Sequence, residues 1–103
     1  MPWPRNPVPE HVVSDLVRRR AVVSGRVQGV WYRDTARREA ERLGLAGRAV
    51  NQADGTVLLE AEGGEAAVDA FLAWAAEGPP RATVDVVTVE AVEPLRRPGF
   101  TVA

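Results

Sequence analysis

Residues 21–43 read AVVSGRVQGVWYRDTARREAERL and join an apolar strand to a helix through a short loop. The β-branched run at their start closes a buried strand that we expect over residues 16–24. Gly25 and Gly29 then interrupt the pattern, which predicts a tight loop. Apolar residues recur after the loop at the spacing of one helix face: Tyr32, Ala36, Ala40 and Leu43. The stretch therefore predicts a strand, a glycine loop and an amphipathic helix in succession.

Two further strands follow in a hairpin. The first is expected over residues 47–52, and Asp54-Gly55 behind it is a strong signal for a tight β-turn. Residues 57–62 alternate between apolar and other residues, which predicts a strand with one apolar and one largely solvated face. Their two acidic residues fall on the face expected to be solvated.

The last third of the chain predicts a second helix and a final strand. The apolar positions of the helix lie at i, i+3, i+4 and i+7: Val68, Phe71, Leu72 and Ala75. Gly78-Pro79-Pro80 ends it. A fourth strand is expected over residues 82–92, where a slip in alternation at Val86-Val87 indicates a bulge. Residues 100–102 suit a short edge strand.

The resulting order of elements is β, α, β, β, α, β. Right-handed crossovers place both helices on one face, so this order predicts an α+β, ferredoxin-like sandwich. Its sheet is expected to be mostly antiparallel, with four to five strands. Four prolines within residues 1–15 predict a flexible leader, which leaves one domain over residues 16–103.

The composition restricts the chemistry. A chain of 103 residues with 46% hydrophobic and 26% charged residues is typical of one soluble domain. The absence of cysteine excludes disulfides, thiolate zinc sites and a cysteine nucleophile, and His11 is the only histidine. The sequence contains neither a signal peptide nor an apolar run of the roughly 20 residues that a membrane span needs. We therefore expect a cytoplasmic protein without a membrane partner.

Charge is distributed unevenly along the chain. Residues 1–50 carry ten arginines and five acidic residues, whereas residues 51–103 carry three arginines and nine acidic residues. Pairing of the two halves across the fold is the favoured explanation, and an anionic ligand is the alternative. We interpret Arg18-Arg19-Arg20 primarily as exposed charges at a strand edge or end. The second interpretation is that they attract an anionic substrate over a long range.

The loop and helix start at residues 23–33 suit an anion. A glycine-containing loop there turns backbone N–H groups inward, and the helix N-terminus adds the positive end of its dipole. Arg33 follows directly, where a guanidinium can contact two phosphate oxygens. The Gly-Lys-Ser/Thr ending of a nucleotide-binding P-loop is missing. From these residues alone, an anion site and a purely structural turn both remain open.

Three motifs resemble the acylphosphatase family. Residues 23–33, with Val-Gln-Gly-Val before an aromatic-Arg pair, are similar to the first signature of that family. Residues 47–57 resemble the second signature, which includes a functional Asn, and residues 78–84 resemble the link between second helix and fourth strand. The resemblance covers residues 16–103. Tyr32 stands where the family usually has Phe, so its hydroxyl needs a partner.

The resemblance implies a monomeric hydrolase that cleaves the carboxyl–phosphate bond of acyl phosphates to a carboxylate and inorganic phosphate, without a metal or cofactor. Arg33 would bind the phosphoryl oxygens and Asn51 would orient the attacking water. Backbone N–H groups of the loop would complete the phosphate site: Gln28, Gly29, Val30, Trp31 and Tyr32. The Gln28 side chain is expected to brace the loop through hydrogen bonds to backbone, and Trp31 to wall it.

Two alternatives come from other classes of function. A non-catalytic or regulatory acylphosphatase-like domain would carry the same phosphate-binding residues. An RNA-binding module can share the βαββαβ order, but it stacks bases on aromatic side chains of its strands. Residues 55–62 contain no aromatic residue and two acidic ones, so we expect no nucleic-acid partner.

Overall fold

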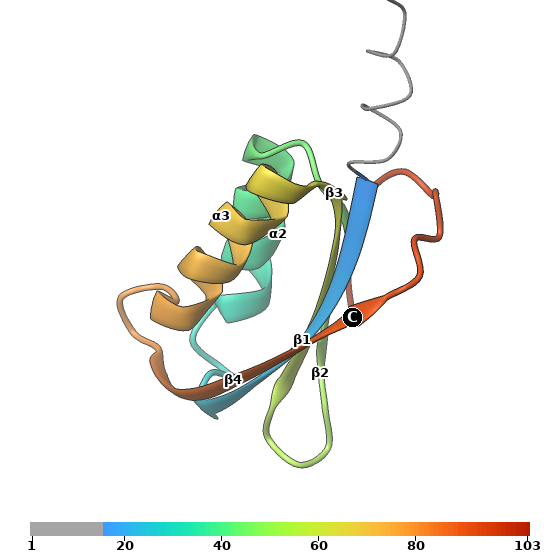
Figure 1. Cartoon of the computed structure of the whole chain (residues 1–103). Coiled ribbons are helices and arrows are strands. Elements are labelled where there is room, and N and C mark those ends of the chain that lie inside the picture. The colour runs from blue at the N-terminus through green and yellow to red at the C-terminus, as the bar shows by residue number, and fades with distance from the viewer. Residues whose placement is uncertain (1–15) are drawn as a thin grey trace, which may run out of the picture.

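The computed structural model describes residues 16–103, in which two helices pack on one face of a five-stranded sheet (Figure 1). The predicted leader at residues 1–15, with His11, lies outside the described residues. None of the helices in residues 16–103 is long and apolar enough to cross a membrane. The elements follow in the order β1 (Leu16–Arg26), α2 (Tyr32–Arg42), β2 (Ala46–Asn51), β3 (Val57–Gly64), α3 (Glu65–Glu77), β4 (Thr83–Val92) and β5 (Phe100–Val102).

The strand order in the sheet is β4-β1-β3-β2-β5. All neighbours pair antiparallel except β2 and β5, which are parallel. Because β1 and β2 both run antiparallel to β3, they run parallel to each other. Their carboxyl ends therefore lie at the same end of the sheet, which brings the loop after β1 towards the end of β2. The predicted ferredoxin-like sandwich is confirmed.

The predicted bulge is present in β4. Ser24 pairs with Val86, whereas Gly25 pairs with Val84, so Asp85 is the additional residue. The register shift follows the slip in apolar alternation that the sequence shows next to this position. An ideal Cβ on Gly25 would stand 2.2 Å from the carbonyl oxygen of Thr83, which is why the bulge needs glycine there.

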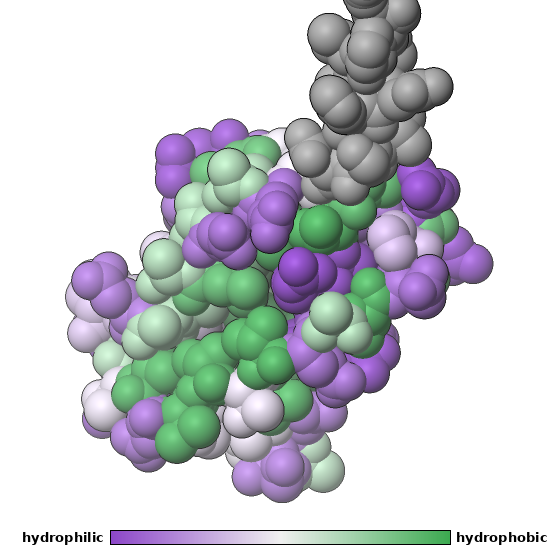
Figure 2. Space-filling view, in the orientation of Figure 1, coloured by the Kyte–Doolittle hydropathy of each residue, from purple (hydrophilic) through white to green (hydrophobic). Residues whose placement is uncertain are grey.

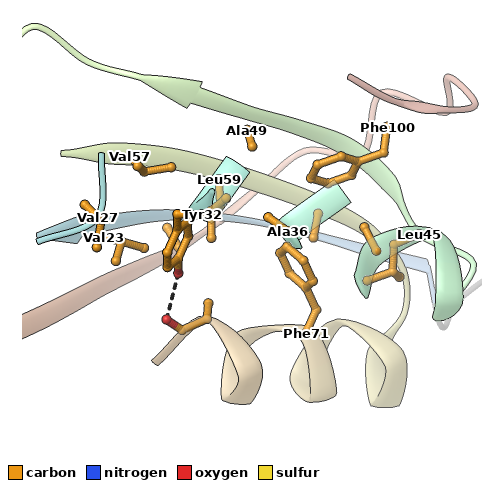
Figure 3. Packing of buried hydrophobic residues seen from close by; sticks show 14 of the residues in the cluster. Val23, Val27, Tyr32, Ala36, Leu45, Ala49, Val57, Leu59, Phe71 and Phe100 are labelled. Carbon is orange, nitrogen blue, oxygen red and sulfur yellow. Dashed lines mark hydrogen bonds between the residues drawn. The ribbon is translucent and has the colours of Figure 1, made fainter. Parts of the chain in front are cut away.

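The core lies between the helices and the inner face of the sheet (Figure 3). Tyr32, Ala36 and Ala40 of α2 are buried, as are the predicted apolar residues of β3. From α3, Phe71 packs against Phe100 of β5 with ring centroids 5.9 Å apart. The short last strand is thus part of the core, and burial of an aromatic ring of this size is a large apolar contribution.

The outer face of β3 is not solvated, so that prediction is wrong. Glu60 and Glu62 are each only 4% exposed, and Arg18 of β1 only 5%. Arg18 donates hydrogen bonds of 2.6 Å to Glu60 and 3.0 Å to Glu62. Arg20 and Arg48 also donate to Glu60, at 2.8 and 3.3 Å. The favoured pairing of the basic half with the acidic half is therefore confirmed.

Two features of the fold explain this burial. First, β1 lies between β4 and β3, so Arg18 is on a central strand rather than an exposed edge. Secondly, the connection between β4 and β5 runs over Glu62, whose carboxylate accepts hydrogen bonds from the backbone N–H groups of Leu95 (2.7 Å) and Arg96 (2.8 Å). Non-local packing thus buries charges that local alternation assigned to solvent.

Strand β4 forms one edge of the sheet and carries exposed apolar side chains. Val86 is 57% and Val89 45% exposed. Figure 2 shows apolar surface gathered along the part of the molecule where Figure 1 shows β4. The β4 edge is also interrupted by the bulge at Asp85, and bulges make an edge less suited to pairing with another chain.

Candidate active site

Unused backbone donors line the loop between β1 and α2. Within residues 16–103, no acceptor takes a hydrogen bond from the N–H groups of residues 28–34; the first helical bond of α2 runs from Thr35 to Trp31. The first N–H groups of any helix lack intrahelical partners, and the helix dipole adds partial positive charge there. The loop is therefore suited to a bound anion, as its glycines and position predict.

The loop backbone turns through two left-handed residues. Gly29 has φ +75° and Trp31 φ +66°. Glycine adopts such angles at little cost, whereas a tryptophan does not. Trp31 is held there by its carbonyl oxygen, which accepts hydrogen bonds from the N–H of Thr35 (3.0 Å) and from the Thr35 hydroxyl (2.8 Å).

Gln28 fixes the loop to the neighbouring hairpin. Its side-chain amide donates to the carbonyl oxygens of Gln52 (2.8 Å) and Thr56 (2.9 Å), which flank the turn between β2 and β3. The predicted brace is confirmed. Val30 is buried in the core, 5% exposed. The side chains of Gln28 and Val30 therefore position the loop rather than line its cavity.

A cavity of about 200 Å³ opens at this end of the sheet. It brings together both predicted catalytic side chains with three of the five predicted loop residues. Its lining consists of Val27, Gly29, Trp31, Tyr32, Arg33 and Asn51. Val27 was not predicted as a site residue; it is 1% exposed and forms an apolar part of the wall.

Arg33 reaches the cavity from the first turn of α2. One guanidinium nitrogen donates a 2.5 Å hydrogen bond to the main-chain oxygen of Ala103, next to β5. The neighbouring Asp34 is bound instead by Arg37 at 2.9 Å and Arg38 at 3.0 Å. Among residues 16–103, no Asp or Glu side chain pairs with Arg33, and its bond to Ala103 uses one guanidinium nitrogen, so the other N–H groups are available to an anionic ligand.

Asn51 is the last residue of β2 and faces the same cavity. Its backbone N–H donates to the main-chain oxygen of Ala103 at 3.2 Å, so Ala103 links it to Arg33. The side-chain oxygen Oδ1 is buried, and no donor within residues 16–103 binds it. A buried acceptor without a donor is costly, and it suits a ligand or water that can donate.

Tyr32 contributes to the cavity wall, but its ring lies in the core. The ring centroid is 5.3 Å from that of Trp74, and the hydroxyl donates a 2.7 Å hydrogen bond to the carbonyl oxygen of Ala75 (Figure 3). The Tyr32 hydroxyl, which the family's usual Phe lacks, thus finds its hydrogen-bond partner in a backbone carbonyl of α3. Burial raises the pKa of Tyr32, so the phenol stays protonated at neutral pH.

Ala103 is a further residue at the site that the sequence analysis did not predict, because no local sequence pattern indicates its contacts. Its main-chain oxygen accepts hydrogen bonds from Arg33 and Asn51 because β5 runs parallel to β2 and ends beside it. That contact depends on strand pairing far along the chain.

Within the described residues, no group of three or more His, Cys, Asp or Glu side chains is placed to hold a metal ion.

These features define a ferredoxin-like α+β sandwich with a small cavity between its first loop and its second strand, in which Arg33 and Asn51 are the polar side chains. The model of the acylphosphatase family matches residues 19–102. The chain therefore belongs to the acylphosphatase family.

Relatives and solved structures agree with this assignment. The chain is 59% identical to an acylphosphatase of Xanthomonas euvesicatoria over 69 residues, which are 67% of this chain and 78% of the relative. It is 52% identical to that of Anaeromyxobacter dehalogenans over 82 residues, 80% of this chain and 88% of the relative. The structure of an acylphosphatase from Coxiella burnetii superposes with a TM-score of 0.85 at 34% identity, covering 88% of this chain and 96% of that one. The predicted family and enzyme class are confirmed.

Proposed function

We propose that the enzyme hydrolyses acyl phosphates with Arg33 and the 28–32 loop holding the phosphoryl group and Asn51 orienting the water. The observation that carries this proposal is the pairing, in one cavity, of a guanidinium that binds no Asp or Glu side chain of residues 16–103 and a buried acceptor that no donor of those residues binds. The first group suits phosphoryl oxygens, and the second suits a water that donates to it.

Charge development in the reaction explains why these groups suffice. Phosphoryl transfer spreads negative charge over three equatorial oxygens, with the attacking and leaving oxygens roughly in line. Fixed N–H donors and Arg33 stabilise that charge without reorganising. Oδ1 of Asn51 accepts a hydrogen bond from the water and leaves an oxygen lone pair directed at phosphorus. The new P–O bond forms as the bond to the acyl oxygen breaks, and a carboxylate leaves. One proton of the water moves to a phosphoryl oxygen and the other stays, so the second product is dihydrogen phosphate.

The leaving carboxylate needs little help, and this supports a reaction without metal. A carboxylate is a weak base and departs unprotonated at neutral pH. We propose that the enzyme works without metal or cofactor, as a monomer in the cytoplasm, and releases inorganic phosphate. The RNA-binding alternative lacks comparable support, because neither β1 nor β3 contains an aromatic residue.

The experiment is a hydrolysis assay on the purified full chain. Phosphate release from acetyl phosphate and benzoyl phosphate is followed at pH 7 with and without excess EDTA. We expect turnover of both substrates, unchanged by the chelator. Phosphate binding without turnover would assign the chain to the non-catalytic alternative, and loss of turnover in EDTA would contradict the metal-free mechanism.

A further inference from the structure

Trp31 is the most exposed large apolar residue in the described part of the chain, and it stands at the cavity. Its side chain is 74% exposed, although the other described tryptophan, Trp74, packs against Tyr32 and Phe71. Leaving an indole in water forgoes the stabilisation that its burial would provide. Trp31 also lines the cavity that contains Arg33 and Asn51. An exposed aromatic beside a cavity that also contains a guanidinium suits an anionic ligand with an apolar part.

The backbone holds Trp31 in an unfavourable conformation. Its φ of +66° is in the left-handed region, which costs a residue with a Cβ free energy relative to glycine. Two hydrogen bonds from Thr35 to its carbonyl oxygen, of 3.0 and 2.8 Å, fix this geometry. Strain of this kind persists where surrounding contacts determine it, and it is concentrated at functional sites. The first turn of α2 therefore fixes the backbone from which the indole projects.

Geometry of the substrate links the indole to the acyl group. When the loop donors and Arg33 hold the phosphoryl group, the acyl group lies against the remaining wall residues of the cavity. The wall residue with a large apolar surface exposed there is Trp31, because Val27 and Tyr32 are each only 1% exposed. The indole therefore faces the part of the substrate that varies between acyl phosphates.

We propose that Trp31 forms an acyl-group subsite that favours acyl phosphates with a flat aromatic acyl group. The inference rests on the proposed function for the placement of the phosphoryl group. Stacking between aromatic rings is favourable beyond the area that it buries, by an amount equivalent to about two- to tenfold in affinity. The enzyme should therefore prefer benzoyl phosphate to acetyl phosphate, and the preference should depend on Trp31.

The test compares Trp31→Gly and Trp31→Phe with the wild type. Glycine accepts the positive φ, so Trp31→Gly should fold at least as well as the wild type. The measured quantity is the ratio of kcat/KM for benzoyl phosphate to that for acetyl phosphate, because effects on the shared phosphoryl group cancel in it. We expect the ratio to fall about two- to tenfold in Trp31→Gly and to be largely retained in Trp31→Phe.

A binding measurement separates failure of the inference from failure of the proposed function. Titration calorimetry with benzylphosphonate and methylphosphonate needs no turnover. The wild type should bind benzylphosphonate about two- to tenfold more tightly, and Trp31→Gly should lose that preference. Leu95→Ala, which truncates another exposed apolar residue outside this cavity, should keep it. An unchanged preference in Trp31→Gly overturns the subsite, whether or not the chain hydrolyses acyl phosphates.

Discussion

Arg33 and Asn51 share one cavity but should affect different steps. Arg33→Ala removes the guanidinium that we propose to contact the phosphoryl group, so phosphate affinity and kcat/KM should both fall. Asn51→Ala removes the oxygen that we propose to orient the water and that binds no donor within residues 16–103, so kcat should fall while phosphate affinity is largely unchanged. Loss of one such fixed group commonly costs about 10²–10³-fold in kcat. Calorimetry with phosphate and steady-state kinetics measure the two effects. Equal losses of phosphate affinity in both variants would contradict the separate roles.

The hydroxyl of Tyr32 has a structural role that the sequence around α3 explains. A helical carbonyl normally accepts from the N–H four residues later, but that position after Ala75 is Pro79, which has no N–H. The Tyr32 hydroxyl satisfies this carbonyl at 2.7 Å. Tyr32→Phe should therefore lower the free energy of unfolding by about 1–3 kcal/mol, the cost of a buried acceptor without a donor. Urea denaturation measures the loss; unchanged stability would mean that the carbonyl finds another donor.

For individual residues, the sequence predicted which side chains lie at the site better than it predicted the groups that they contact. The motif resemblance pointed to Arg33 and Asn51, and the chemistry of a glutamine side chain in a loop pointed to the Gln28 brace, whose two carbonyl partners at Gln52 and Thr56 were not predicted. The contacts of Ala103 with Arg33 and Asn51 were not predictable, because they require β5 to lie parallel to β2. A partner that depends on tertiary pairing leaves no local pattern.

The network on the outer face of β1 and β3 should make stability depend on pH. Burial opposes ionisation of Glu60, but hydrogen bonds from Arg18, Arg20 and Arg48 outweigh it and lower the pKa of Glu60 from 4.5 to about 2. A carboxyl whose pKa is lower in the folded state contributes stability above its unfolded pKa. That contribution is lost as pH falls through the folded pKa. Stability should therefore decrease between about pH 4.5 and about pH 2.

Glu60→Gln is the matched control for this pH dependence. It removes the titrating group but keeps a similar shape, and it leaves Arg18 buried without one of its two carboxylate partners. The variant should be less stable than the wild type at pH 6, and the gap should narrow as pH is lowered. Urea unfolding at pH 6, 4 and 3 tests this. A gap that stays constant over that range would show that the charge of Glu60 is not the source.

Strand β3 shows what alternation along a strand can predict about burial and what it cannot. Its alternation correctly assigned Val57, Leu59 and Ala61 to the core face. The same pattern predicted a solvated face for Glu60 and Glu62, which are buried. Alternation determines the side on which a residue lies, but not what covers that side. Here the cover comes from arginines of neighbouring strands and from the connection before β5.

For the whole molecule, element order was enough to predict the architecture. The sequence βαββαβ with short connections allows few arrangements once crossovers are right-handed. In the observed order, β1 and β2 lie on either side of β3 and run parallel to each other, which places the first loop and Asn51 at one end of the sheet. The candidate site thus follows from topology, although Arg33 and Asn51, 18 positions apart in sequence, suggest no contact by themselves.

Binding at this end of the sheet should stabilise the molecule as a unit. A ligand that binds only the folded state adds RT ln(1 + [L]/Kd), which is about 1.4 kcal/mol at ten times Kd. For a domain of this size, that corresponds to a rise in Tm of roughly 5–10 °C. Phosphate also stabilises proteins non-specifically by exclusion from their surface, so the specific effect is the difference between wild type and Arg33→Ala. Scanning calorimetry over a phosphate series should show a Tm in the wild type that rises with the logarithm of phosphate concentration above Kd, and only the shallow rise from exclusion in Arg33→Ala. Identical curves for the two proteins would mean that phosphate acts through the solvent, and would place the phosphoryl group elsewhere than at the start of α2.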